Sequence, residues 1–184
     1  HAVKVFEQLG HRVEEAAPRT GLPFDTFAAS AGTMYFVGDE FFLEEHPNEI
    51  TDYLKAFLET ARNLTGIEVA KSWLEVERIR GALLDFFEEY DLLLTPTTAV
   101  PTSKIGHKIG QRDTSLGKGG FSPFNCVFNL SRNPAASVPC GFSSDGLPIG
   151  LQIVGRLEDD ITVLRASAAF EEVCPWADKY PPVS

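Results

Sequence analysis

The chain has 184 residues, of which 43% are hydrophobic and 23% charged, as is typical of one soluble globular domain with a sizeable core. Its net charge of −10 argues against nucleic acid as a partner, because binding to phosphates needs clustered lysines and arginines. No apolar run approaches the roughly 18 residues of a membrane span, so we expect no membrane partner.

The first residues predict short elements. Apolar side chains recur at near-helical spacing over residues 2–9, and Gly10 stands where a glycine would end a helix. Because the chain opens inside this pattern and without a methionine, we expect it to be a piece of a longer protein. Residues 12–16 then predict a short strand, which Pro18 closes.

Three helices are predicted between residues 23 and 90. The first begins at Pro23, a residue tolerated in a first helical turn, and runs to about Phe36. The second ends at Asn63 after starting at residue 48 or 51. The third, from Ile67 to Tyr90, repeats apolar residues at three- and four-residue steps. The expected core-facing residues of the three are Phe24, Phe27, Ala28, Ala31, Tyr35, Phe36, Ile50, Leu54, Phe57, Leu58, Val69, Trp73, Val76, Ile79, Leu83, Phe86, Phe87 and Tyr90.

The pattern changes at Asp91 from helical to strand-like. A short apolar run at 92–94 predicts a buried strand, and the Gly-, Ser- and Lys-rich residues 101–123 predict an irregular loop. Strand-like residues at 136–139 and 149–154 flank the turn that contains Asp145-Gly146. Since Asp-Gly is a strong turn signal, these two strands predict a hairpin.

A last helix is predicted from Asp160 to Val173, with Asp159 or Asp160 as its N-cap. Its expected buried residues are Ile161, Leu164, Ala168 and Phe170. The fold class is therefore α/β, with residues 1–90 mainly helical and residues 91–184 holding strands, loops and the final helix. Two or three short strands are too few for a free-standing sheet beside so many helices, so we expect the sheet to be incomplete in this chain.

Residue patterns that carry hydrolytic or metal chemistry are weak. Gly141 to Gly146 misses the G-x-S-x-G spacing by one position and reads more simply as a turn. Cys140 has no histidine nearby in sequence to lower its pKa, so we interpret it as structural. Leu116 to Gly120 lacks the spacing of a phosphate loop, and Ser103-Lys104 side chains on an extended segment point to opposite faces.

The histidines and cysteines do not predict a metal site. The four histidines show no H-E-x-x-H or H-x-H spacing, and the three cysteines show no C-x-x-C spacing. An odd number of cysteines without such spacing does not suggest a disulfide framework, and a cytoplasmic location fits best. We expect no metal and no organic cofactor.

Three stretches together carry a family resemblance. They are DLLLTPTTAVP from Asp91, FSPFNCVFNLSRNPAASVPCGF from Phe121, and DGLPIGLQIVGR from Asp145. In this order they resemble the C-terminal part of the amidase signature family. The start, with GHRVEEAAP, and the ending AAFEEVCPWADKYPP extend the resemblance over nearly the whole chain. It implies an α/β/α fold with a mixed sheet flanked by helices.

The resemblance implies chemistry whose residues lie outside this chain. Family members hydrolyse or transfer the acyl part of a carboxylic amide through an acyl-enzyme, with a Ser–cis-Ser–Lys triad and without metal or cofactor. Their nucleophile lies in an upstream Gly/Ser-rich segment, and nothing similar occurs here. The expectation is a chain with no catalytic residues that borders the cavity for a small amide substrate. By resemblance, the bordering residues are Thr95, Thr97, Thr98, Phe124 and Asn125.

Two branches of the family compete. The A-type chain of the tRNA-dependent amidotransferase tends to carry Asp, Thr and Gly where this chain has Ser122, Asn125 and Arg132. The chain therefore looks more similar to the free-standing amidases, although they too usually have Thr in place of Asn125. That amidotransferase chain and a non-catalytic interaction domain descended from an amidase remain alternatives. Strands that expect cover on both faces also predict self-association into a homo-oligomer.

Overall fold

The computed structural model describes residues 1–102 and 123–179. The expected loop at 101–123 therefore lies almost wholly outside the described residues. With it lie Ser103, Lys104, His107, the Leu116–Gly120 stretch and Ser122.

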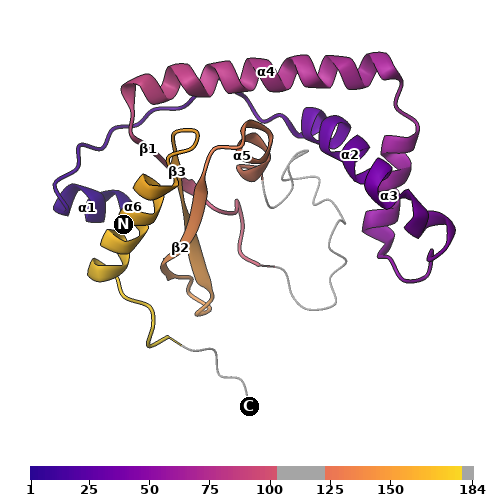
Figure 1. The fold of residues 1–184 in the computed structure, drawn as a ribbon. Helices are drawn as coiled ribbons and strands as arrows, with labels where there is room; N and C mark the ends of the chain where they lie inside the picture. Colours follow the sequence, from indigo (N-terminus) through magenta and orange to yellow (C-terminus); the bar gives the residue numbers. More distant parts are fainter. Residues whose placement is uncertain (103–122, 180–184) are drawn as a thin grey trace.

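A three-stranded antiparallel sheet forms the centre of the structure (Figure 1). Its strands are β1 (Leu92–Pro96), β2 (Ala135–Phe142) and β3 (Pro148–Gly155), in the order β1-β3-β2. β2 and β3 form the predicted hairpin, and β1 pairs with the other edge of β3. Both outer strands have a free edge within the described chain, as expected for an incomplete sheet.

Helices cover both faces of this sheet (Figure 1). α6 packs on one face of β2 and β3, with α1 beside it, whereas α4 and α5 pack on the other face. α2 and α3 form a helical pair that is attached to α4. The helices are α1 (Ala2–Gln8), α2 (Phe24–Glu44), α3 (Asp52–Arg62), α4 (Gly66–Glu89), α5 (Asn125–Ser131) and α6 (Asp160–Val173).

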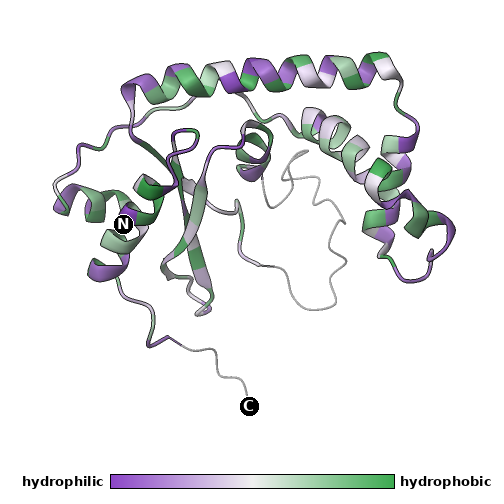
Figure 2. Ribbon diagram, in the orientation of Figure 1, coloured by the Kyte–Doolittle hydropathy of each residue, from purple (hydrophilic) through white to green (hydrophobic). Residues whose placement is uncertain are grey.

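Two hydrophobic cores result, because successive side chains of a strand point to opposite faces. On β3, Ile153 faces the core with α1 and α6, and Val154 faces the core with α4 and α5; both are fully buried. Figure 2 shows hydrophobic residues along the strands and a mixed pattern along α4. β3 therefore belongs to both cores and connects them.

The helix starts follow standard capping chemistry. The Thr65 hydroxyl accepts from the Glu68 N–H, and the Glu68 carboxylate accepts from the Thr65 N–H at 2.8 Å, which makes a capping box for α4. These hydrogen bonds lower the pKa of Glu68. Thr51 and Asp159 cap α3 and α6 in the same way. The start of α6 at Asp160 confirms the sequence-based assignment.

Two predicted elements were wrong. Residues 12–16 form no strand and run as an irregular segment, where Glu14 accepts hydrogen bonds from Arg12 and from Tyr90. No neighbouring strand offers this segment a ladder among the described residues. α2 continues to Glu44 rather than ending near Phe36, since no proline stands in its way before Pro47.

The predicted buried faces of α2, α4 and α6 were wrong in part. Tyr35 and Trp73 are exposed, and α6 buries Val163, Ala166 and Phe170 while Ile161 and Leu164 stay 62% and 65% exposed. Ala168 is also exposed. Because α6 carries apolar residues on more than one side, only its contact with the sheet decides which stripe is buried.

The close helix crossing lies at Gly32 and not at Gly81. A Cβ at Gly32 would stand 3.3 Å from the ring of Phe57 on α3, whereas a Cβ at Gly81 would meet nothing within 4 Å. The crossing is therefore between α2 and α3.

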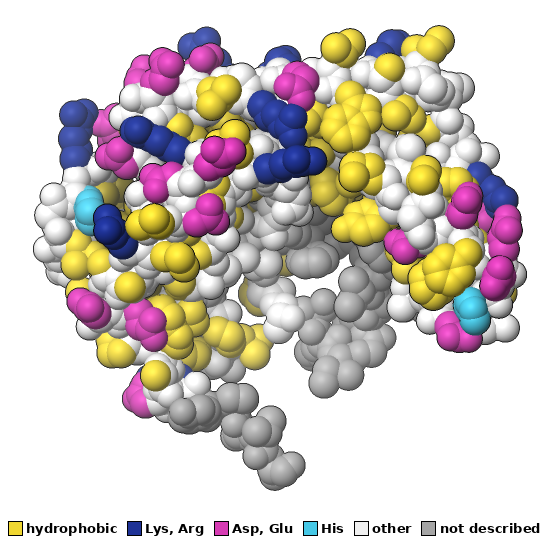
Figure 3. All heavy atoms as spheres, viewed as in Figure 1, with side chains coloured by type: hydrophobic (Ala, Val, Ile, Leu, Met, Phe, Trp, Pro, Cys, Tyr) yellow, Lys and Arg dark blue, Asp and Glu magenta, His cyan; other side chains and the backbone are white. Residues whose placement is uncertain are grey.

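Apolar side chains remain exposed at the surface in two places. Figure 3 shows hydrophobic side chains gathered over the junction of α2, α3 and α4, where Met34, Val37 and Trp73 are exposed. Ile161 and Leu164 form the second place, on α6. None of the described helices is long and apolar enough to cross a membrane.

The hairpin turn gives a stability prediction. Gly146 has a φ of +77°, and Ser143 and Leu147 are joined across the turn by a backbone hydrogen bond of 2.8 Å. We expect Gly146→Val to lower stability by about 1 kcal/mol or more, because a branched side chain is strained at positive φ. The melting temperature should fall by about 2–4 °C per kcal/mol.

Gly81→Ala is the matched control. Its Cβ would meet no neighbour, and alanine is favoured over glycine in a helix, so the melting temperature should stay or rise. Equal losses in both variants would contradict the assigned turn.

The exposed apolar residues predict self-association of the isolated chain. Such residues on α2 and α6 favour contact with another apolar surface. We expect sedimentation equilibrium to show a mass that rises with concentration, and Leu164→Glu to weaken that association. A monomer that binds no hydrophobic dye would contradict this expectation.

Candidate substrate pocket

One face of the sheet changes from apolar to polar along its length. On the α5 side, the row Leu93–Val154 belongs to the hydrophobic core, and the next row consists of Thr95, Gln152 and Ser137. These three polar side chains come from β1, β3 and β2, respectively. The sheet therefore offers hydrogen-bonding groups just where the apolar core ends.

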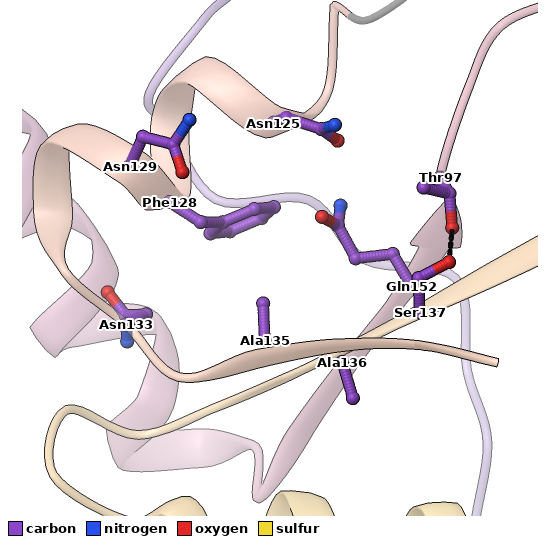
Figure 4. Close-up of a pocket in the computed structure, with 9 residues that line it drawn as sticks. All are labelled: Thr97, Asn125, Phe128, Asn129, Asn133, Ala135, Ala136, Ser137 and Gln152. Atoms are coloured by element: carbon purple, nitrogen blue, oxygen red, sulfur yellow. Dashed lines mark hydrogen bonds between the residues drawn. The ribbon is translucent and has the colours of Figure 1, made fainter.

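A pocket of about 310 Å³ lies between this polar row and α5 (Figure 4). Its lining contains hydroxyl and carboxamide groups but no charged side chain among the described residues. The lining residues are Thr97, Asn125, Phe128, Asn129, Asn133, Ala135, Ala136, Ser137 and Gln152.

A hydroxyl pair spans the central strand at one side of the pocket. Thr97 Oγ1 and Ser137 Oγ lie 2.7 Å apart in a hydrogen bond, although they stand on or after the two outer strands of the sheet. Gly150 of β3 lies between them, and a Cβ there would come within 2.7 Å of Thr97 Oγ1 and 2.9 Å of Ser137 Oγ. The absent side chain of Gly150 therefore makes room for this contact. The backbone N–H of Thr97 also donates to the Gly150 carbonyl at 3.0 Å.

A second chain of hydrogen bonds orients Gln152, which is 6% exposed. The Thr95 hydroxyl donates its one proton to the Pro96 carbonyl at 3.1 Å, so its oxygen serves as acceptor for Gln152 Nε2 at 2.8 Å. This order fixes the Gln152 amide with its nitrogen toward Thr95. Figure 4 shows the amide of Gln152 between Phe128 and Asn125, at the centre of the pocket.

The turn after α5 holds that helix over the sheet. Arg132 ends the helix at a left-handed φ of 66°, a position where glycine is usual. Asn133 Nδ2 then donates to the Gly155 carbonyl at 2.8 Å. This contact ties the end of α5 to the end of β3, so that Asn125 and Phe128 face the polar row.

Asn125 carries an unsatisfied polar atom. Its Oδ1 is buried and accepts no hydrogen bond. A buried acceptor without a partner costs about 1–3 kcal/mol, and such atoms are few in native proteins. The pocket wall therefore contains one hydrogen-bond acceptor that has no protein donor.

The sequence-predicted site residues fall into three groups. Thr97 and Asn125 line the pocket, and Thr95 contacts it through Gln152. Thr98 donates to the Val100 carbonyl, and Phe124 is the N-cap of α5, so neither is among the lining residues. That these residues border a substrate stays a prediction.

Sequence reasoning missed several lining residues. Ser137 and Gln152 were read only as strand residues, although polar residues inside otherwise apolar strands were a usable signal. Asn129 and Asn133 had no such signal, because their position depends on where α5 packs.

The other reactive groups are placed structurally. Burial raises the pKa of the Cys140 thiol, which disfavours the thiolate that a nucleophile needs. The Ser143 hydroxyl accepts from the Leu147 N–H inside the hairpin turn. No group of three or more potential metal ligands occurs within residues 1–102 and 123–179.

Comparisons with known proteins give a consistent result. A family model described as Amidase matches residues 1–164. The chain is 35% identical to an acylamidase of Rhodococcus erythropolis, over 98% of this chain and 39% of that protein. It is 30% identical to the A-type chain of the glutamyl-tRNA(Gln) amidotransferase of Oceanobacillus iheyensis, over 98% of this chain and 41% of that protein.

A solved structure agrees with these relatives. A bacterial aryl acylamidase of the amidase signature family superimposes with a TM-score of 0.78 at 26% identity, covering 95% of this chain and 39% of that one. The chain thus spans about two fifths of the length of the relatives it matches.

The hydroxyl pair predicts the effect of a small substitution. Gly150→Ala should separate Thr97 from Ser137 and lower stability by about 1–3 kcal/mol, since the added methyl overfills the space and breaks a hydrogen bond. Denaturant unfolding measures this loss.

A double-mutant cycle identifies its cause. Thr97→Val removes the same hydrogen bond, so the double variant should lose less than the sum of the single variants. Strict additivity would show that the two sites do not share an interaction.

Proposed function

This chain belongs to the amidase signature family, and from that premise we propose that it is the C-terminal part of an amidase that hydrolyses carboxylic amides. The single observation that best supports the proposal is the pocket of hydroxyl and carboxamide groups beside α5. Such groups bind a neutral amide, which both donates and accepts hydrogen bonds.

The chain's part in that reaction is to form one wall of the substrate cavity. By resemblance, the nucleophilic Ser, the bridging cis-Ser and the unprotonated Lys come from upstream segments of the longer protein. The nucleophile would attack the amide carbonyl, release the amine and form an acyl-enzyme that water then hydrolyses. In residues 1–102 and 123–179 no serine hydroxyl is hydrogen-bonded to a lysine, which fits a division of labour between segments.

A second candidate is the A-type chain of a tRNA-dependent amidotransferase. It is favoured by the 30% identity to such a chain over nearly the whole length of this one. Against it stand Ser122, Asn125 and Arg132 at the places where that branch tends to carry Asp, Thr and Gly. No carboxylate among the described residues lines the pocket to pair with the ammonium group of free glutamine. We therefore prefer the free-standing amidase.

The remaining proposals are secondary. A non-catalytic domain descended from an amidase would share this fold, and the presence of an upstream Gly/Ser-rich segment in the full-length protein would argue for the enzyme. We place the protein in the cytoplasm, which is supported by the three free thiols Cys126, Cys140 and Cys174.

The proposal predicts where activity resides. The isolated chain of 184 residues should not hydrolyse aliphatic or aryl amides above background, whereas the full-length protein should. The test measures amine release from a panel of simple amides with both proteins.

Two variants of the isolated chain serve as controls. Turnover that Cys140→Ala or Ser143→Ala abolishes would mean that the chemistry lies in this chain. A full-length protein without activity on any amide would argue for the non-catalytic alternative.

A further inference from the structure

The unsatisfied Oδ1 of Asn125 is the starting point. It is the only buried side-chain oxygen or nitrogen without a hydrogen-bond partner in the part of the chain that the structure describes. Asn125 also lines the pocket, where Figure 4 shows it across from Thr97 and Gln152. A buried acceptor beside a pocket is satisfied when a ligand brings a donor.

The neighbouring groups restrict what that ligand is. Thr97 and Ser137 each have one hydroxyl proton, and their mutual hydrogen bond uses only one of the two. The other proton remains for a ligand acceptor such as a carbonyl oxygen. The pocket therefore pairs a free acceptor, Asn125 Oδ1, with a free hydroxyl donor.

Charge is the second restriction. The described lining holds neither a carboxylate nor a cationic side chain. An ammonium group that enters such a site loses its hydration without gaining a counter-charge, and a neutral N–H or O–H does not carry this penalty. The geometry thus favours a neutral donor over a charged one.

We propose that Asn125 is a specificity-determining residue whose Oδ1 accepts a hydrogen bond from a neutral N–H or O–H group of the substrate, apart from the scissile bond. The substrate class is then neutral amides whose acyl chain carries a hydroxyl or carboxamide. This inference rests on the proposed amidase function. Asn125 acts in selection and takes no part in bond breaking.

The test uses the full-length protein and acyl p-nitroanilides of increasing chain length. At each length the acyl chain ends in a methyl, a hydroxyl, a carboxamide or an ammonium group, so that only the end group changes. We expect the hydroxyl and carboxamide ends to exceed the methyl end in kcat/KM by about two- to tenfold at one chain length, the worth of one neutral hydrogen bond. The ammonium end should be the poorest.

Two variants at the same position test the role of Oδ1. Asn125→Leu has nearly the same shape without the acceptor, so the preference over the methyl end should disappear, mainly through KM. Asn125→Asp supplies a carboxylate, so the ammonium end should become the preferred one. Asn63→Leu, at an exposed asparagine after α3, should leave all ratios as in the unchanged protein.

A readout apart from activity separates ligand from protein partners. If a segment outside this chain donates to Asn125 in the full-length protein, Asn125→Leu loses that bond and its melting temperature falls. If the substrate is the donor, the melting temperature of the free enzyme stays or rises, because an unsatisfied acceptor has been removed.

The outcomes are distinct. A lower melting temperature together with unchanged end-group ratios in Asn125→Leu overturns this inference and leaves the amidase proposal intact. A full-length protein that hydrolyses none of the anilides or simple amides overturns both. Loss of the end-group preference in Asn125→Leu with its gain for ammonium in Asn125→Asp supports the inference.

Discussion

The sandwiched position of β3 is the constraint on which the rest of the structure depends. β3 pairs with β1 on one edge and β2 on the other, and its successive side chains enter opposite cores. Since a shift by one residue would exchange Ile153 and Val154 between cores, the register of the sheet is strongly fixed. That register places Gly150 and Gln152 beside their partners on both outer strands.

The pocket follows from the same register. As β3 extends beyond the contact with α4 and α5, its α5-side residue changes from Val154 to Gln152 and then to Gly150. The hydrophobic effect no longer selects apolar residues where the covering helices end, so polar groups are tolerated there. Gly150 adds the space in which hydroxyl groups from two non-adjacent strands meet.

This arrangement bears on the choice between family branches. A site of hydroxyl and carboxamide groups discriminates by hydrogen-bond pattern rather than by charge, and such sites strongly disfavour ligands that leave buried polar groups unpaired. Asn125, where relatives by resemblance usually have Thr, extends a longer acceptor into the pocket and leaves its Oδ1 without a protein donor. The departure from the family pattern therefore lies at the position that the proposed selectivity uses.

The sequence by itself determined the family, the α/β class, the β2–β3 hairpin and most helix positions. These features depend on local chemistry, such as the Asp145-Gly146 turn, the Asp159 cap and the apolar spacing of α4. It also pointed to Thr97 and Asn125. Only the tertiary structure decided which stripe of α6 is buried, that α2 crosses α3 at Gly32, and that Ser137 and Gln152 join the pocket. The reason is physical: a stripe or polar residue acquires its role from the surface packed against it, and residues distant in sequence supply that surface.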